Sequence, residues 1–171
     1  MRAGTDNKVR IAIAGIGNCA SSLIQGIEHY RSLGKDNPKK SLGLMHYDLG
    51  GYAPGDIEVV AAFDIDSRKV GKSLRDAVFA KPNCTKIFYP NIPDYDVTVM
   101  MGKVLDGVSR HMSSNEKDKR VIISSQRPCD AAKVLRESRA DMLLSYLPVG
   151  SEKATAYYAE QCLRSGAGFI N

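Results

Sequence analysis

The chain has 171 residues, of which 43% are hydrophobic and 25% charged, and these values are typical of one soluble globular domain. A net charge of +5 could suggest a nucleic-acid partner. The distribution argues against one, because the basic residues lie in separate polar stretches with few aromatic residues among them. No stretch approaches the roughly 20 apolar residues of a membrane span, and the four cysteines lack metal-ligand spacing. We therefore expect a cytoplasmic protein without a metal site, membrane contact or nucleic-acid partner.

The first predicted elements are a strand at about 9–14 and a helix at about 18–32, joined by a glycine-rich turn. The turn has the form G-x-G-x-x-A, with Gly15, Gly17 and Ala20 at its fixed positions. The first glycine permits a sharp turn, the second lets a pyrophosphate approach the backbone, and the alanine lets the helix pack closely on the strand. The helix N-terminus would offer N–H groups to the phosphates. The pattern predicts a dinucleotide site; the alternative is a glycine turn in another α/β domain.

The second predicted strand, at about 58–63, ends at Asp64. In dinucleotide-binding folds, an acidic residue at this point binds the adenosine ribose hydroxyls. The spacing from Gly15 to Asp64 is more than twice the roughly 20 residues that are typical, so we place the excess in the glycine- and proline-rich stretch 34–56. Asp66 competes for this role, but its position two residues beyond the strand suits helix capping better.

The rest of the chain continues to alternate between strand and helix patterns. The predicted elements are a helix at 67–80 capped by Ser67, a strand at 97–100, a short helix or loop at 102–112, a polar loop at 113–120, a strand at 121–123, a helix at 130–139, a strand at 141–147, a helix capped by Ser151 that runs to about Arg164, and a last strand at 167–171. Such alternation predicts an α/β fold with a doubly wound parallel sheet, a Rossmann-like domain that takes up residues 1–171.

Several segments are more specific than the glycine motif alone. They are residues 15–23 (GIGNCASSL), 43–46 (GLMH), 60–66 (VAAFDID), 69–71 (KVG), 105–107 (LDG), 145–152 (SYLPVGSE) and 169–171 (FIN). Together they resemble the N-terminal part of the bacterial type of inositol-3-phosphate synthase, also called myo-inositol-1-phosphate synthase. The resemblance covers nearly the whole chain, and only residues 109–130 match poorly.

The resemblance implies an NAD-dependent isomerase that converts D-glucose 6-phosphate to 1D-myo-inositol 3-phosphate and forms homo-oligomers. In that family, bound NAD oxidises a ring-carbon hydroxyl to a ketone, enolisation and an intramolecular aldol closure follow, and NADH returns the hydride. A cofactor that is used twice in one turnover should be held tightly. By resemblance, the cofactor-binding residues would be Gly15, Gly17, Asn18, Cys19, Asp64, Ser145, Leu147, Pro148, Val149 and Tyr158. The segment 147–149 also suits a plain strand end and turn, and a tyrosine in an amphipathic helix is usually a core residue.

Members of the family are much longer, and by resemblance their catalytic lysines and phosphate-binding residues lie beyond the FIN segment. Residues 1–171 contain no combination that could serve as acid, base and phosphate clamp, so we name no catalytic residue. We expect an incomplete sheet and a catalytic domain that is absent from this chain. Two alternatives stay open, a non-catalytic NAD-binding module and a fragment of another NAD-dependent dehydrogenase-like protein. We also expect Phe169 and Ile170 to expose apolar atoms near a free sheet edge.

Overall fold

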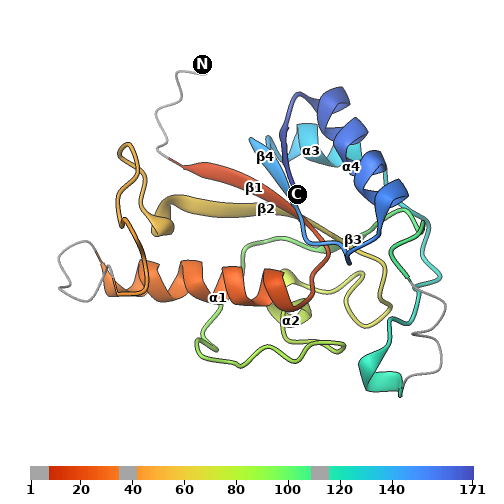
Figure 1. The fold of residues 1–171 in the computed structure, drawn as a ribbon, viewed down its shortest axis with the longest axis horizontal. Helices are drawn as coiled ribbons and strands as arrows, with labels where there is room; N and C mark the ends of the chain where they lie inside the picture. The colour runs from red at the N-terminus through yellow and green to blue at the C-terminus, as the bar shows by residue number, and fades with distance from the viewer. Residues whose placement is uncertain (1–7, 35–41, 109–115) are drawn as a thin grey trace.

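The structure is a computed structural model that describes residues 8–34, 42–108 and 116–171, and it contains one parallel sheet with helices on both faces (Figure 1). In chain order the elements are β1 (Val9–Ala14), α1 (Asn18–Leu33), the 3-10 helix η1 (Pro54–Asp56), β2 (Ile57–Asp64), α2 (Leu74–Ala77), β3 (Val99–Met101), the 3-10 helix η3 (Lys117–Lys119), α3 (Ala131–Glu137), β4 (Met142–Ser145), α4 (Glu152–Ser165) and β5 (Gly168–Ile170). The strand order is β3-β2-β1-β4-β5, and all neighbouring strands are parallel. This topology confirms the predicted Rossmann-like α/β fold.

The central strand β1 is buried on both faces of the sheet. Ile11 and Ile13 pack in the core beneath α1, whereas Ala12 and Ala14 pack in the core beneath α3 and α4. Because successive side chains of a strand point to opposite faces, a strand covered on both sides is apolar throughout. Figure 1 shows α1 on one side of the sheet and α3 and α4 on the other.

The helix predicted at 67–80 is wrong in extent. Residues 67–72 form turns, and only Leu74–Ala77 is helical. Gly71 has a φ of +81°, which interrupts a right-handed helix. The helix begins after Ser73, whose Oγ accepts the Asp76 N–H at 3.2 Å, whereas the N–H of Ser67 donates to Ile122 O at 2.7 Å. These turns come soon after the carboxyl end of β2.

The middle of the chain has less regular structure than its patterns suggest. The strand predicted at 97–100 is β3, at Val99–Met101. The strand predicted at 121–123 is wrong, because this segment forms only an isolated antiparallel bridge between Asp66 and Ile123. Residues 102–108 form no helix, and the loop predicted at 113–120 contains η3 among its described residues 116–120. The predictions for 109–115 lie outside the described residues.

The last third of the chain agrees with the pattern more closely. The Asp130 carboxylate caps α3 by accepting the Lys133 N–H at 3.0 Å. Gly166, at a φ of +79°, ends α4 in the left-handed conformation that glycine adopts without strain. The following strand β5 forms one edge of the sheet, opposite β3. Phe169 is half-buried against the α3–α4 side, whereas Ile170 is 51% exposed.

Candidate functional site

A cleft opens where β1, β2 and β4 end. Its walls are the glycine turn after β1, the residues after β2, part of the segment 103–107, the turn after β4 and the first half of α4. The carboxyl ends of parallel strands are where open α/β sheets bind ligands. Six of the ten predicted cofactor-binding residues line this cleft: Gly15, Gly17, Asp64, Leu147, Pro148 and Tyr158.

The two glycines of the turn do different things. Gly15 has a φ of +91°, and a Cβ added there would lie 2.8 Å from Tyr146 O. This position therefore requires glycine for conformation and for close packing against the end of β4. Gly17 has a φ of −100°, and a Cβ there would meet nothing within 4 Å. The space above Gly17 is open, as the approach of a pyrophosphate requires.

Asp64 is fixed at the tip of β2 by three backbone hydrogen bonds. Its Oδ1 accepts the N–H groups of Ile65 at 2.7 Å and Asp66 at 2.8 Å. Its Oδ2 accepts the N–H of Ile16, in the glycine turn, at 2.8 Å. Asp64, the predicted ribose ligand, is therefore hydrogen-bonded directly to the glycine turn, which is the predicted pyrophosphate site.

Lys69 lies beneath the same turn, and sequence reasoning did not name it as a site residue. Its side chain is 2% exposed, and its Nζ donates to Ile16 O at 2.5 Å and to Pro82 O at 3.3 Å. Burial lowers the pKa of Lys69 despite the nearby carboxylates of Asp64 and Asp66. The signal in the sequence is weak, because a lysine predicted on an amphipathic helix is normally assigned to its solvated face.

Asp66 is a buried structural acid and does not cap a helix as expected. It is 1% exposed and forms a bidentate pair with Arg68, at 2.9 Å from Nε and 2.7 Å from Nη2. It also accepts the Ile122 N–H at 2.9 Å, while Arg68 donates to Arg120 O at 2.6 Å. Burial alone would raise the pKa of Asp66, but the hydrogen bonds from Arg68 and Ile122 outweigh it, so the pKa lies below its usual value. The pair fastens residues 120–122 beside the cleft.

The two helices that begin beside the cleft have different N-termini. The Asp106 carboxylate caps α4 by accepting the N–H groups of Lys153 at 2.8 Å and Ala154 at 2.9 Å. These bonds lower the pKa of Asp106. The expected cap, Ser151, instead donates its hydroxyl to Pro148 O at 2.6 Å. By contrast, α1 has no acidic residue in its first turn and follows Gly17, which has no side chain to cap it. The N–H groups at the start of α1 are thus the ones left for an anion.

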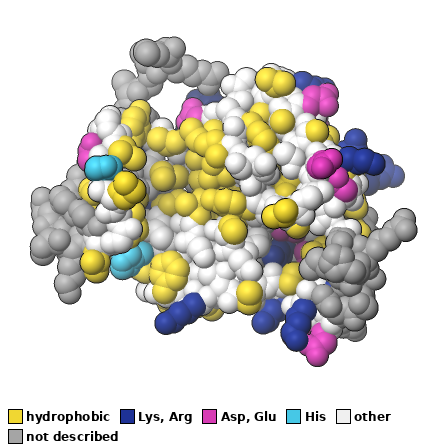
Figure 2. Space-filling view, in the orientation of Figure 1, with side chains coloured by type: hydrophobic (Ala, Val, Ile, Leu, Met, Phe, Trp, Pro, Cys, Tyr) yellow, Lys and Arg dark blue, Asp and Glu magenta, His cyan; other side chains and the backbone are white. Residues whose placement is uncertain are grey.

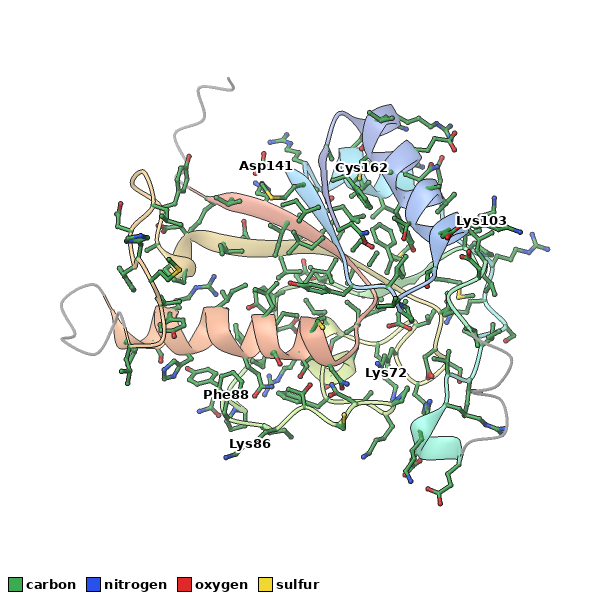
Figure 3. All side chains as sticks on the ribbon, viewed as in Figure 1. Lys72, Lys86, Phe88, Lys103, Asp141 and Cys162 are labelled. Carbon is green, nitrogen blue, oxygen red and sulfur yellow. The ribbon has the colours of Figure 1, made fainter. Side chains whose placement is uncertain are left out.

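Lys103 and Tyr158 form the α4 side of the cleft. Figure 3 labels Lys103 beside α4, and its Nζ lies 5.1 Å from the centroid of the Tyr157 ring. Tyr158 is 3% exposed and packs on Phe63 with ring centroids 5.7 Å apart, and burial raises the pKa of its hydroxyl. A Cβ added at Gly102 would lie 2.5 Å from that hydroxyl. Tyr158 is therefore both a core residue and a wall of the cleft.

Four predicted residues do not line the cleft. Asn18 and Cys19 line a second groove, beside α1, and the Asn18 Oδ1 accepts the Cys84 N–H at 2.9 Å. Ser145 is buried, and its hydroxyl has no hydrogen-bond partner among the residues that the structure describes. Val149 is fully exposed. Figure 2 shows hydrophobic side chains gathered over the middle of the visible face, and the groove beside α1 includes Leu23, Ile27, Leu44, Ile57 and Tyr146.

The described residues offer neither a metal centre nor a membrane-spanning helix. Within residues 8–34, 42–108 and 116–171, no group of three or more His, Cys, Asp or Glu side chains could hold a metal ion. In the same part of the chain, the helices are too short or too polar to cross a lipid bilayer.

The chain is similar to several known proteins. It is 44% identical to an inositol-3-phosphate synthase of Corynebacterium glutamicum and 43% identical to that of Mycolicibacterium smegmatis, over 164 residues in each case. These alignments cover 95% and 96% of this chain but only 43% of each relative, so the chain spans less than half the length of the curated relatives it matches. No protein-family model matches.

Two solved structures are also similar. The protein in the crystal structure of Ari2 is 32% identical to this chain, with a TM-score of 0.75. The match covers 96% of this chain and 45% of the Ari2 chain. A myo-inositol-1-phosphate synthase-related protein from Thermotoga maritima is 18% identical with a TM-score of 0.55, with 95% of this chain and 47% of that one covered. This second likeness supports the fold alone.

Proposed function

We propose that this chain, which is homologous to inositol-3-phosphate synthases over their N-terminal part, is the NAD-binding portion of such an enzyme. The observation that carries the proposal is the junction of the glycine turn and Asp64 at the carboxyl edge of the sheet, with Oδ2 of Asp64 2.8 Å from the Ile16 nitrogen. The homology supports NAD as the cofactor, and the cleft at the carboxyl ends of the strands is consistent with a dinucleotide site.

The described residues fit a dinucleotide in two respects. The open space above Gly17 admits a pyrophosphate, and the uncapped start of α1 provides N–H donors for it. Asp64 lies at the tip of β2, and its carboxylate would accept hydrogen bonds from the adenosine ribose hydroxyls. NAD, when bound, would accept a hydride from the substrate and return that hydride later in the turnover. The residues of this chain would bind and orient the cofactor.

For the whole protein we propose the conversion of D-glucose 6-phosphate to 1D-myo-inositol 3-phosphate in a cytoplasmic homo-oligomer. The support is the sequence identity to the two synthases. The residues described here would hold the cofactor, and the acid, base and phosphate-binding groups would come from the part of the relatives that this chain does not match.

Calorimetric titration of the 171-residue chain with NAD, ADP-ribose and nicotinamide mononucleotide tests the proposal. We expect NAD and ADP-ribose to bind with similar affinity, because the glycine turn and Asp64 would contact the adenosine and pyrophosphate portions that both ligands share. The mononucleotide should bind much more weakly. Absence of NAD and ADP-ribose binding at millimolar concentration would contradict the assignment.

A further inference from the structure

We propose that Lys69 is a positioning residue of the dinucleotide site: it fixes the glycine turn through the Ile16 carbonyl and places a positive charge beneath the pyrophosphate position. This inference rests on the proposed function and deepens it. Under this proposal, the turn that follows β2 contributes to cofactor affinity through a residue outside the glycine motif.

The geometry holds Ile16 from both sides. The Asp64 Oδ2 accepts the Ile16 N–H at 2.8 Å, and the Lys69 Nζ donates to the Ile16 carbonyl at 2.5 Å. Ile16 itself is fully buried, so the turn cannot shift without breaking these bonds and its packing. One acid and one base, five residues apart in sequence, thus define the conformation of the two peptide groups between Gly15 and Gly17.

The burial of Lys69 points to a role beyond that of a hydrogen-bond donor. Within the described residues, no carboxylate forms an ion pair with its ammonium. Its two described acceptors are both neutral carbonyls, those of Ile16 and Pro82. A buried charge without an ion-pair partner is destabilising, and such groups concentrate at functional sites. Since Lys69 also lines the cleft, an anion over the glycine turn would supply the missing negative charge.

The ammonium makes a charge-assisted hydrogen bond, which is stronger than the bond that a neutral amine would form. The charged groups that act on it are Asp64 and Asp66, which favour the ammonium, and Arg68, which opposes it. Loss of the proton would weaken the hold on Ile16 and remove the positive charge from the cleft. Cofactor affinity should therefore depend on the protonation of this side chain.

The test compares NAD affinity in wild type, Lys69→Met and Lys72→Met. Lys72 is an exposed lysine three residues away, labelled in Figure 3, and serves as the matched control. We expect Lys69→Met to weaken NAD binding about tenfold or more, the range for loss of a hydrogen bond to a charged group, and Lys72→Met to bind as wild type does. If Lys69→Met keeps wild-type affinity, the role of Lys69 is overturned while the proposed function stands. If wild type itself does not bind NAD, both fall.

A pH titration of wild type needs no variant and applies even if Lys69→Met does not fold. Because the pKa of Lys69 lies below the ordinary lysine value of 10.5, we expect NAD affinity to fall as the pH rises toward that value and Lys69 loses its proton. Affinity that stays constant up to that pH would overturn the proposal. The unfolding free energy provides a second readout. Because the pKa of Lys69 is lower in the folded chain, its own contribution to stability rises with pH in this range. As the pH rises, the stability difference between wild type and Lys69→Met should therefore shift in favour of wild type, while the advantage of wild type in NAD affinity should shrink. A merely structural lysine would change the stability difference alone and leave NAD affinity independent of pH.

Discussion

The Asp64 carboxylate accepts the Ile16 N–H at 2.8 Å, so the acid at the tip of β2 and the glycine turn after β1 form one unit. The two features lie far apart in sequence, and each by itself is a weak indication of a dinucleotide site. Their direct hydrogen bond means that a change in either should be felt by the other.

The first prediction concerns cofactor choice. NAD should bind roughly tenfold or more tightly than NADP, because Asp64 would repel a 2′-phosphate at the ribose position. The basic residues nearby do not offset this. Arg68 is paired with Asp66 and with the Arg120 carbonyl, and Lys69 is buried beneath the turn. Calorimetry with both cofactors measures the ratio, and equal or tighter NADP binding would contradict the role of Asp64.

The second prediction separates the two glycines. Gly17→Val should abolish NAD binding but leave the fold intact, since its side chain would enter the open space that the pyrophosphate would take. The backbone at Gly17 has an ordinary φ of −100°, so the loss comes from the filled space and not from backbone freedom. Gly15→Ala should instead lower stability by about 1–3 kcal/mol through positive-φ strain and the clash with Tyr146.

Thermal unfolding and calorimetry on both variants check this distinction. Gly26→Ala is the matched control, because Gly26 lies in α1 and a Cβ there meets nothing within 4 Å. It should raise stability by about 0.5–1 kcal/mol without changing affinity. Near-native NAD binding by Gly17→Val would mean that the glycine turn is structural only.

The third prediction concerns acid. The folded pKa of Asp66 lies below its ordinary value of 3.8, so its carboxylate stabilises the fold above about pH 4, and this stabilisation is lost as the pH falls through the lowered pKa. Asp66→Asn should therefore destabilise the chain at pH 7 and progressively less below pH 4. Urea unfolding from pH 7 to 2 measures the difference. A penalty that stays constant with pH would show that the charge of Asp66 is unimportant.

A double-mutant cycle with Arg68→Met identifies the partner. Because Asp66 and Arg68 form a bidentate pair, their effects on the unfolding free energy at pH 7 should be strongly non-additive. Additive effects would mean that the bonds of Asp66 to the backbone carry its contribution.

The fourth prediction is that the 171-residue chain forms no inositol phosphate from D-glucose 6-phosphate and NAD. The reason is that it matches only 43% of the length of the two synthases. Product formation is followed by chromatography of the phosphate esters, with the Corynebacterium glutamicum enzyme as the positive control. Turnover by the purified chain would place the catalytic groups within these residues.

The fifth prediction concerns self-association. We expect the 171-residue chain to dimerise or aggregate at micromolar concentration, because β5 is an edge strand with Ile170 51% exposed, and an apolar groove runs beside α1. Light scattering measures the mass, and Ile170→Lys should shift it toward the monomer. A monodisperse wild-type monomer with cooperative unfolding would contradict this expectation and favour an independent binding module.

The sheet could be predicted from sequence because its determinants are local. Ile11 and Ile13 alternate with Ala12 and Ala14 in one apolar run, and this suffices to identify a strand covered on both faces. The extent of α2 was missed because the apolar spacing at Val70, Leu74 and Val78 suits a helix, while the positive φ at Gly71 interrupts it.

The charged part of the site could not be predicted, because its partners are distant in sequence. The acceptor of Lys69 is a backbone carbonyl 53 positions away, and Asp106 caps a helix 47 residues farther along. Both side chains lie in segments that resemble the family, at 69–71 and 105–107, but nothing in their local pattern shows which backbone groups they bind. Such contacts depend on the packing of whole elements against each other, which periodicity does not encode.

The cap on α4 has a further consequence. Asp106 binds the amides of Lys153 and Ala154, so the loop that contains Asp106 holds the start of α4. Three other residues of the same loop, Lys103, Leu105 and Gly107, line the cleft. A ligand that steadies this loop would also slow the opening of these two hydrogen bonds. Amide hydrogen exchange at Lys153 and Ala154 would then respond to occupancy of the cleft without either amide touching the ligand. The first turn of α4 is in this sense a built-in reporter of binding.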